Sequence, residues 1–237
     1  MPTIGFAGLG LMGAGIAGNI LKGGYPLEVL AHRNRQPIDD LVAKGATEAR
    51  DAAQLGADCD IVFLCVTGAP QVEALIEGEA GIRAGAKRAG RDALVIIDCS
   101  TSEPTVTRRL AESLAAEGFD LIDAPLGGTP TQAMAGELQA IVGADDGVLE
   151  HVRPVLETWT SKIIHVGPVG AGHTMKLLNN FLAMGYGAIF AEALTIGAKA
   201  GITPQTFDSV IRGSRMDSGF YRTFFQYVLE RDRDAHR

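Results

Sequence analysis

The 237-residue sequence contains little cysteine, with Cys59, Cys65 and Cys99 as its only three. An odd number of cysteines cannot all pair within one chain, and none of the three shows the C-x-x-C spacing of a zinc or redox motif. Cys65 and Cys99 end apolar, strand-like runs. We therefore expect buried free thiols in a reducing cytoplasm, and no metal site.

Positive charge is also scarce, because 21 lysines and arginines face 28 aspartates and glutamates and leave a net charge of −7. This balance argues against nucleic acid and against an anionic membrane as partners. The sequence shows no basic leader followed by an apolar stretch, and no apolar run approaches the ~20 residues of a bilayer-spanning helix. We expect a cytoplasmic protein whose partner is a small molecule.

Short apolar runs alternate with amphipathic stretches over the first two thirds of the chain. Predicted strands cover residues 3–7, 28–31, 61–66, 94–99, 121–124, 138–142 and 162–166, and predicted helices cover 14–22, 38–44, 72–76, 104–117 and 147–159. This alternation predicts βαβ units in a mainly parallel, doubly wound sheet, so the fold class is α/β. Later residues predict only helices, at 173–200, 203–209 and 220–229.

A glycine pattern stands between the first predicted strand and the first predicted helix. Gly8-Leu9-Gly10-Leu11-Met12-Gly13 fits G-x-G-x-x-G. In dinucleotide-binding domains the first glycine permits a tight turn, the second admits the pyrophosphate, and the third lets helix and strand touch. The helix N-terminus offers unpaired N–H groups to the phosphates. We therefore predict a Rossmann domain over residues 1–165 and a helical domain over 166–237.

The end of the second predicted strand bears on the choice of cofactor. NAD-binding domains place an acidic residue there for the ribose hydroxyls, but this sequence reads Ala31-His32-Arg33-Asn34-Arg35. Arg33 and Arg35 instead offer guanidinium groups to a 2′-phosphate. We predict NADP as the preferred cofactor, with NAD as the alternative, and Arg33 and Asn34 at the site. Arg35 is equally explained as a solvated arginine.

Four motifs, in this order, resemble the β-hydroxyacid dehydrogenases, the family of 3-hydroxyisobutyrate dehydrogenase and 6-phosphogluconate dehydrogenase. They read GFAGLGLMGAGIAGN at 5–19, DCSTSEPT at 98–105, DAPLGGTPTQAMAGEL at 123–138 and GAGHTMKLLNN at 170–180. Together they extend over essentially the whole chain. The resemblance implies an NAD(P)-dependent enzyme that moves a hydride between the nicotinamide and a small acid substrate.

The resemblance also assigns roles to individual positions. It places Val66 and Thr67 beside the adenosine and ribose, Thr101 at the nicotinamide, Gly127, Gly128 and Thr129 at the substrate's acidic group, and Lys176 and Asn180 at the reacting atoms. Lys176 would be the general acid and base, and Asn180 would orient the substrate hydroxyl.

Two departures from the family pattern matter. The usual DAPVSGG is DAPLGGT here, with Gly127 in the serine position and Thr129 in place of the second glycine. This variant resembles the branch that includes sulfolactaldehyde reductase, so the identity of the acid stays open. The family also continues into helices that carry a lysine–aspartate pair closing over the cofactor. The sequence ends before that pair, so we expect an incomplete helical domain.

Lys176 and Asn180 lie one helical turn apart and therefore share a helix face. We expect Leu177, Leu178 and Phe181 to pack inward on the other side. Desolvation lowers the pKa of a lysine, and a substrate anion raises it again. A neutral amine can then take the hydroxyl proton during oxidation, and an ammonium can protonate the carbonyl during reduction.

Other mechanisms fit less well. The short-chain dehydrogenases use a tyrosine followed four residues later by a lysine, and no tyrosine here has that neighbour. His151 and His165 are expected to be structural, whereas His173 lies near the predicted site. An imine reductase on the same scaffold is the alternative, although such enzymes usually carry an aspartate or tyrosine at the Lys176 position. A non-catalytic dinucleotide-binding protein is the third hypothesis. Small residues along the predicted helix at 173–200 indicate a homodimer or higher homo-oligomer.

Overall fold

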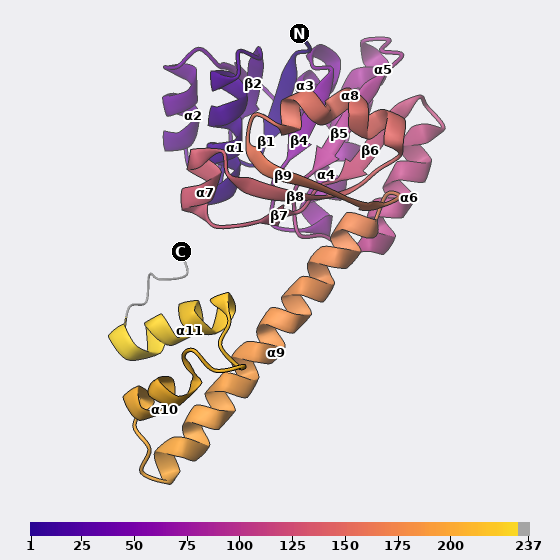
Figure 1. Cartoon of the computed structure of the whole chain (residues 1–237). Helices are drawn as coiled ribbons and strands as arrows, with labels where there is room; N and C mark the ends of the chain where they lie inside the picture. Colours follow the sequence, from indigo (N-terminus) through magenta and orange to yellow (C-terminus); the bar gives the residue numbers. More distant parts are fainter. Residues whose placement is uncertain (232–237) are drawn as a thin grey trace. The chain divides into compact units, whose positions relative to one another are not determined.

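A computed structural model describes residues 1–231 of the chain (Figure 1). Its internal contacts divide the chain into two compact units, Met1–Lys176 and Leu177–Arg237. One long helix, α9 (Ala171–Lys199), contributes residues to both units. The domain boundary after residue 165 therefore stays a prediction, because no break in the contacts falls there.

The first unit is built on a nine-stranded sheet. Its strands are β1 (Ile4–Ala7), β2 (Leu27–Leu30), β3 (Thr47–Ala49), β4 (Ile61–Leu64), β5 (Leu94–Asp98), β6 (Phe119–Asp123), β7 (Leu126–Gly127), β8 (Leu138–Gly143) and β9 (Thr160–Gly167). They are ordered β3-β2-β1-β4-β5-β6-β8-β7, with β9 beside β8. The strands from β3 to β6 in this order run parallel, and β8 runs antiparallel to β6 and β7. Starting from β1, the chain first adds β2 and β3 on one side and then β4, β5 and β6 on the other. Doubly wound sheets bind nucleotides at this switch point, beside β1 and β4.

Helices cover both faces of this sheet (Figure 1). They are α1 (Leu11–Lys22), α2 (Gln36–Val42), α3 (Ala52–Asp58), α4 (Ala69–Glu77), α5 (Ile82–Arg88), α6 (Pro104–Ala115), α7 (Pro130–Ala135) and α8 (Asp146–Leu156). Buried residues of α1, α2 and α8 form one apolar core, and those of α3 to α6 form the other. The predicted fold class, a doubly wound parallel sheet followed by helices, is confirmed.

Side-chain spacing explains how a helix such as α6 forms and packs. Pro104 occupies its first turn, where a missing N–H costs nothing. Thr107, Leu110 and Leu114 recur every three or four residues and are all buried. Burial of each leucine contributes about 1.5–3 kcal/mol through the hydrophobic effect.

All seven predicted strands occur, with ends shifted by at most two residues. The prediction was wrong in omitting five short elements, which are β3, β7, α3, α5 and α7. Two of these are strands of three and two residues, too short to show alternation. The three helices have six or seven residues and are rich in alanine or glycine, so their apolar periodicity is weak.

The second unit contains most of α9, together with α10 (Pro204–Ile211) and α11 (Gly219–Glu230). Aromatic rings join these helices. The rings of Phe190 and Tyr221 lie 5.3 Å apart and those of Phe207 and Phe225 lie 5.5 Å apart. Tyr221 and Phe225 are fully buried, so a small aromatic core holds the unit together.

The apolar surface of α9 differs from the prediction. Leu177, Leu178 and Phe181, which we expected to pack inward, are 42%, 51% and 71% exposed. By length and composition α9 would also suffice to cross a membrane, which the sequence-based expectation of no such helix did not foresee. A single helix of this kind is weak evidence for a span.

Candidate active site

A cavity of about 490 Å³ opens at the carboxyl ends of β1, β2 and β4. Seven residues predicted to bind the cofactor line it: Gly8, Leu9, Gly10, Arg33, Asn34, Val66 and Thr67. Leu11 lines an adjoining hollow of about 660 Å³, which shares Leu9, Gly10 and Asn34 with the first cavity. Met12, Gly13 and Thr101 line neither hollow. The first residues of the G-x-G-x-x-G motif and the residues after β2 and β4 therefore line the same cavity.

The three glycines of the G-x-G-x-x-G motif occupy different environments. Gly8 has a φ of +105°, and a Cβ on it would collide with the backbone carbonyl of Cys65. A Cβ on Gly13 would collide with the carbonyl of Gly8. A Cβ on Gly10 would meet no atom within 4 Å, so the surface of Gly10 is open toward the cavity it lines. The first and third glycines are required by the fold, and the second leaves room for a ligand.

The two arginines after β2 differ in availability. Arg35 is engaged, because its guanidinium contacts Glu48 at 2.9 Å and Asp39 at 3.1 Å. The suggestion that Arg35 reaches a 2′-phosphate is therefore not supported. Arg33 lines the cavity and has no hydrogen bond or ion pair with any residue in 1–231. Of the two, Arg33 is the guanidinium free to bind an anionic group.

The loops after β4 and β5 are joined beside this cavity. The Ser100 hydroxyl accepts the Val66 N–H at 3.0 Å, and the Ser100 N–H donates to Asp98 at 2.9 Å. Thr101 is exposed just after this junction. The hydroxyl of Ser102 is buried without a hydrogen-bond partner among the described residues. These two hydrogen bonds fix the backbone just before Thr101, the residue predicted to contact the nicotinamide.

The predicted substrate loop follows the short strand β7. Gly128 is exposed and has a φ of +132°. Thr129 caps α7, and both its N–H and its hydroxyl are directed to the side-chain oxygen of Gln132, at 3.0 and 3.2 Å. The anion contacts predicted for Thr129 therefore require the Gln132 side chain to move aside.

Lys176 reaches this loop from the first turns of α9. Its Nζ donates to the carbonyl oxygen of Leu126 at 2.7 Å, immediately before Gly127. The side chain is half-buried, and desolvation lowers the pKa of Lys176 below the usual lysine value. No charged group among residues 1–231 contributes to that shift. The amine of the GAGHTMKLLNN motif thus contacts the DAPLGGTPTQAMAGEL motif, at a residue 50 positions earlier in the sequence.

Asn180 lies four residues after Lys176 on α9 and belongs to the second compact unit. It is half-buried. Its contact with the substrate hydroxyl stays a prediction.

No role was assigned to Asp123 from the sequence. Asp123 is fully buried and accepts the backbone N–H groups of Gly170 and His173, both at 2.6 Å. It therefore caps the beginning of α9. The sequence signal was an aspartate ending an apolar strand, but nothing local indicates a helix 47 residues away as its partner.

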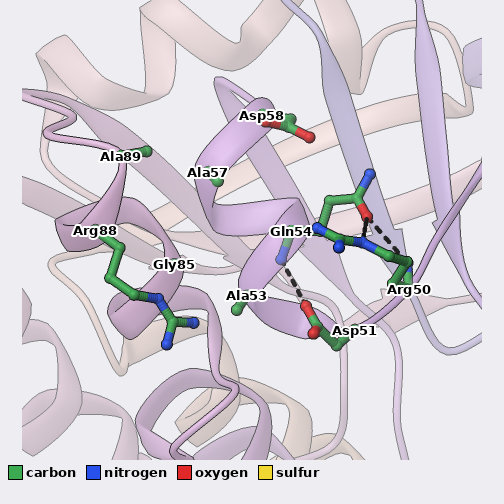
Figure 2. Close-up of a pocket in the computed structure, with 9 residues that line it drawn as sticks. All are labelled: Arg50, Asp51, Ala53, Gln54, Ala57, Asp58, Gly85, Arg88 and Ala89. Atoms are coloured by element: carbon green, nitrogen blue, oxygen red, sulfur yellow. Dashed lines mark hydrogen bonds between the residues drawn. The ribbon is translucent and has the colours of Figure 1, made fainter.

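Another hollow, of about 360 Å³, lies where α3 and α5 cross (Figure 2). Gly85 permits the crossing, because a Cβ on it would collide with the carbonyl of Ala53. The polar groups around it serve local structure. Asp51 accepts the Gln54 N–H at 2.9 Å and caps α3, and the Arg50 side chain donates to Gln54 at 2.9 Å (Figure 2). We assign no ligand to this hollow.

The three cysteines are free, as predicted, with Cys59 and Cys99 buried. Cys65 is only partly buried and lines the cofactor cavity. Desolvation raises the pKa of Cys65 to about 12, so this thiol is protonated and a poor nucleophile at neutral pH. Residues 1–231 contain no group of three or more histidine, cysteine or acidic side chains placed to hold a metal ion.

Two family models match consecutive parts of the chain. Residues 3–167 match the NAD binding domain of 6-phosphogluconate dehydrogenase. Residues 170–236 match the NAD-binding region of NADP-dependent 3-hydroxyisobutyrate dehydrogenase.

Individual relatives agree with these models. The chain is 38% identical over 214 residues to 3-hydroxyisobutyrate dehydrogenase of Pseudomonas aeruginosa, covering 90% of this chain and 70% of that protein. It is 37% identical over 211 residues to 2-(hydroxymethyl)glutarate dehydrogenase of Eubacterium barkeri, covering 88% of this chain and 67% of that protein.

A solved structure of Mycobacterium tuberculosis 3-hydroxyisobutyrate dehydrogenase with L-serine has a TM-score of 0.80 at 30% identity, covering 93% of this chain and 73% of that one. The sequence motifs, the fold, the family models and the relatives all indicate the same family. The chain therefore belongs to the β-hydroxyacid dehydrogenase family of NAD(P)-dependent oxidoreductases.

Proposed function

We propose that this protein interconverts a small β-hydroxyacid and its semialdehyde or keto acid, with NADP as the preferred hydride carrier. One observation carries the proposal: the Lys176 amine contacts the Leu126 carbonyl at 2.7 Å, at the start of the predicted acid-binding loop. This position allows a proton-transfer group and an anion-binding loop to act on the same small molecule.

The residues present suit a bound dinucleotide. Gly10 is open toward the cavity, and Arg33 is unpaired among the described residues. When bound, the nicotinamide supplies or accepts the hydride. Lys176 takes the hydroxyl proton as a neutral amine during oxidation and returns a proton to the carbonyl oxygen during reduction. Gly127, Gly128 and Thr129 would hold the acidic group, and Asn180 would orient the hydroxyl.

The substrate class can be tested by a panel of small acids. Three-carbon and four-carbon β-hydroxyacids, a sulfonate analogue and a cyclic imine would be assayed with each cofactor, following the absorbance of the reduced nicotinamide. We expect turnover of one or more hydroxyacids and none of the imine. Activity on the imine alone would overturn the proposal in favour of an imine reductase.

The cofactor preference depends on Arg33. Replacing Arg33 by alanine is expected to raise the KM for NADPH about 10- to 100-fold, because a charge-assisted contact to the 2′-phosphate contributes about 1.5–3 kcal/mol. The KM for NADH should change less than about twofold. Arg35→Ala is the matched control and should leave both values nearly unchanged, since Arg35 is held by Glu48 and Asp39. Equal losses for both cofactors in Arg33→Ala would contradict the assignment.

We also propose a homodimer or higher homo-oligomer, as expected from the small residues of α9. Large apolar side chains on the same helix support this, because Phe181, Met184 and Ile189 are 71%, 70% and 64% exposed. Sedimentation velocity tests it, and a purely monomeric protein at micromolar concentration would contradict it.

A further inference from the structure

We propose that Asp123 and His173 are positioning residues, which lock the first turn of α9 onto the ends of β5 and β6 and thereby fix the Lys176 amine at the substrate loop. The proposal rests on the proposed function for one point only, the proton-transfer role of Lys176. Neither residue can touch a substrate, because both are 0% exposed.

The carboxylate of Asp123 fastens the backbone of α9. One oxygen accepts the Gly170 N–H and the other accepts the His173 N–H, both at 2.6 Å. A carboxylate at this end of a helix satisfies N–H groups that have no partner within the helix and interacts favourably with its dipole. Asp123 is also the last residue of β6, three residues before Leu126. The same short segment therefore holds both the start of α9 and the carbonyl to which Lys176 donates.

The His173 ring fastens the same turn to a second part of the sheet. Its Nε2 lies 3.1 Å from the Ser100 carbonyl, just after β5, and its Nδ1 lies 2.8 Å from the Thr107 hydroxyl on α6. Because a carbonyl oxygen only accepts, Nε2 carries a proton. The carboxylates of Asp98 and Asp123 flank the ring, each 3.8 Å from one of its nitrogens. The ring is thus fixed from two sides.

These contacts connect Lys176 with the cofactor side of the site. Ser100, whose carbonyl faces the ring of His173, also accepts the N–H of Val66, which lines the cofactor cavity. His173 and Lys176 are three residues apart and hence neighbours on the surface of α9. A continuous set of hydrogen bonds thus runs from the cavity wall to the turn that carries the amine.

Glycine allows the close approach that this arrangement needs. A Cβ on Gly172 would lie 2.9 Å from a carboxylate oxygen of Asp123. A Cβ on Gly143, at the end of β8, would lie 2.9 Å from the Gly172 nitrogen. Cβ atoms in proteins essentially never approach other atoms this closely. A residue larger than glycine at either position would therefore push α9 away from the sheet.

The test combines turnover with direct labelling of the amine. His173→Phe keeps a ring and removes both polar contacts, whereas His173→Gln can still donate to the Ser100 carbonyl. For His173→Phe we expect kcat to fall about 10- to 100-fold, because the amine is displaced, with the KM for NADPH within about twofold. His173→Gln should recover part of kcat.

Acylation of Lys176 by acetic anhydride, measured by peptide mass spectrometry across a pH series, reports on the amine without turnover. Desolvation lowers the pKa of Lys176 in the wild type, so its labelling midpoint should lie below those of exposed lysines. In His173→Phe the midpoint should rise toward theirs. His165→Asn is the matched control, because His165 also contacts two backbone carbonyls, those of Ala144 at 2.8 Å and Gly167 at 3.1 Å, but lies on β9. It should leave kcat and the midpoint unchanged.

The outcomes separate this inference from the proposed function. A wild-type protein inactive on every acid would refute the proposed function, while the labelling midpoints would still test the positioning. A folded His173→Phe with the wild-type kcat and midpoint would overturn the inference. The inference would also be overturned if kcat and NADPH affinity fell equally while the labelling midpoint of Lys176 stayed unchanged. That result would indicate that His173 has only a structural role. If His173→Phe does not fold, Thr107→Val removes the Nδ1 partner alone and should shift both readouts in the same direction by less.

Discussion

Replacing Lys176 by methionine is expected to lower kcat about 10²- to 10⁴-fold, the usual contribution of a general acid or base. Methionine keeps the length of the side chain and removes the titrating group. The fold should survive, since Nζ makes a single hydrogen bond, to the Leu126 carbonyl, and no ion pair among the described residues. Steady-state rates with the best acid of the panel would measure the loss. Lys199→Met, an exposed lysine at the end of the same helix, should retain the wild-type kcat.

The pH dependence of the wild type should follow the same lysine, with opposite signs in the two directions. Oxidation needs the neutral amine, so its rate should rise as pH increases through the pKa of Lys176. Reduction needs the ammonium, so its rate should fall over the same range. In the free enzyme, which kcat/KM reports, desolvation lowers the pKa of Lys176, so both midpoints of kcat/KM should lie below the range of an exposed lysine. A Lys176→Met variant with kcat within about twofold of the wild type, or with the same pH midpoint, would remove the lysine from the mechanism.

Replacing Gly10 by alanine is expected to weaken NADPH binding about 10- to 100-fold, or about 1.4–2.7 kcal/mol, without destabilising the fold. The backbone of Gly10 is extended, with a φ of −75°, and a methyl there meets nothing within 4 Å. The unfolding temperature should therefore stay unchanged. The methyl would, however, occupy the space through which a pyrophosphate approaches the backbone. Titration of NADPH by fluorescence would give the dissociation constant.

Two neighbouring glycines provide controls for this prediction. A Cβ on Gly13 would collide with the carbonyl of Gly8, so Gly13→Ala should lose about 1–3 kcal/mol of stability through overpacking. Gly18 faces open space within α1, so Gly18→Ala should bind NADPH normally and gain up to about 1 kcal/mol from helix propensity. Wild-type affinity in a folded Gly10→Ala variant would contradict the role of Gly10.

Much of the fold could be predicted because its signals are local. The longer strands of the parallel sheet are continuous apolar runs, and each is bounded by helices with apolar residues every three or four positions. β3 could not be predicted, since three residues carry no alternation. This omission had a consequence for the site, because Glu48 on β3 is one of the two acidic residues that engage Arg35, with Asp39.

The candidate site was predictable to the extent that it depends on one contiguous motif. Within the six residues of the G-x-G-x-x-G loop, Gly8 makes the turn, Gly10 leaves open space for a ligand, and Gly13 allows the helix to pack closely against the loop. Thr129 and Gln132 also carried a readable signal, the T-x-x-Q pattern of a capping box, which was overlooked. The Asp123 and His173 contacts had no such signal. Their partners are 47 to 73 residues away, and only the folded sheet brings them together.

The arrangement after β2 has a practical consequence for redesign. Arg35 fastens α2 to β3 through Asp39 and Glu48, whereas Arg33 has no structural partner in the described chain. Arg33 can thus be varied without breaking a contact of the neighbouring scaffold, which makes its codon the place to begin when altering the coenzyme preference proposed above.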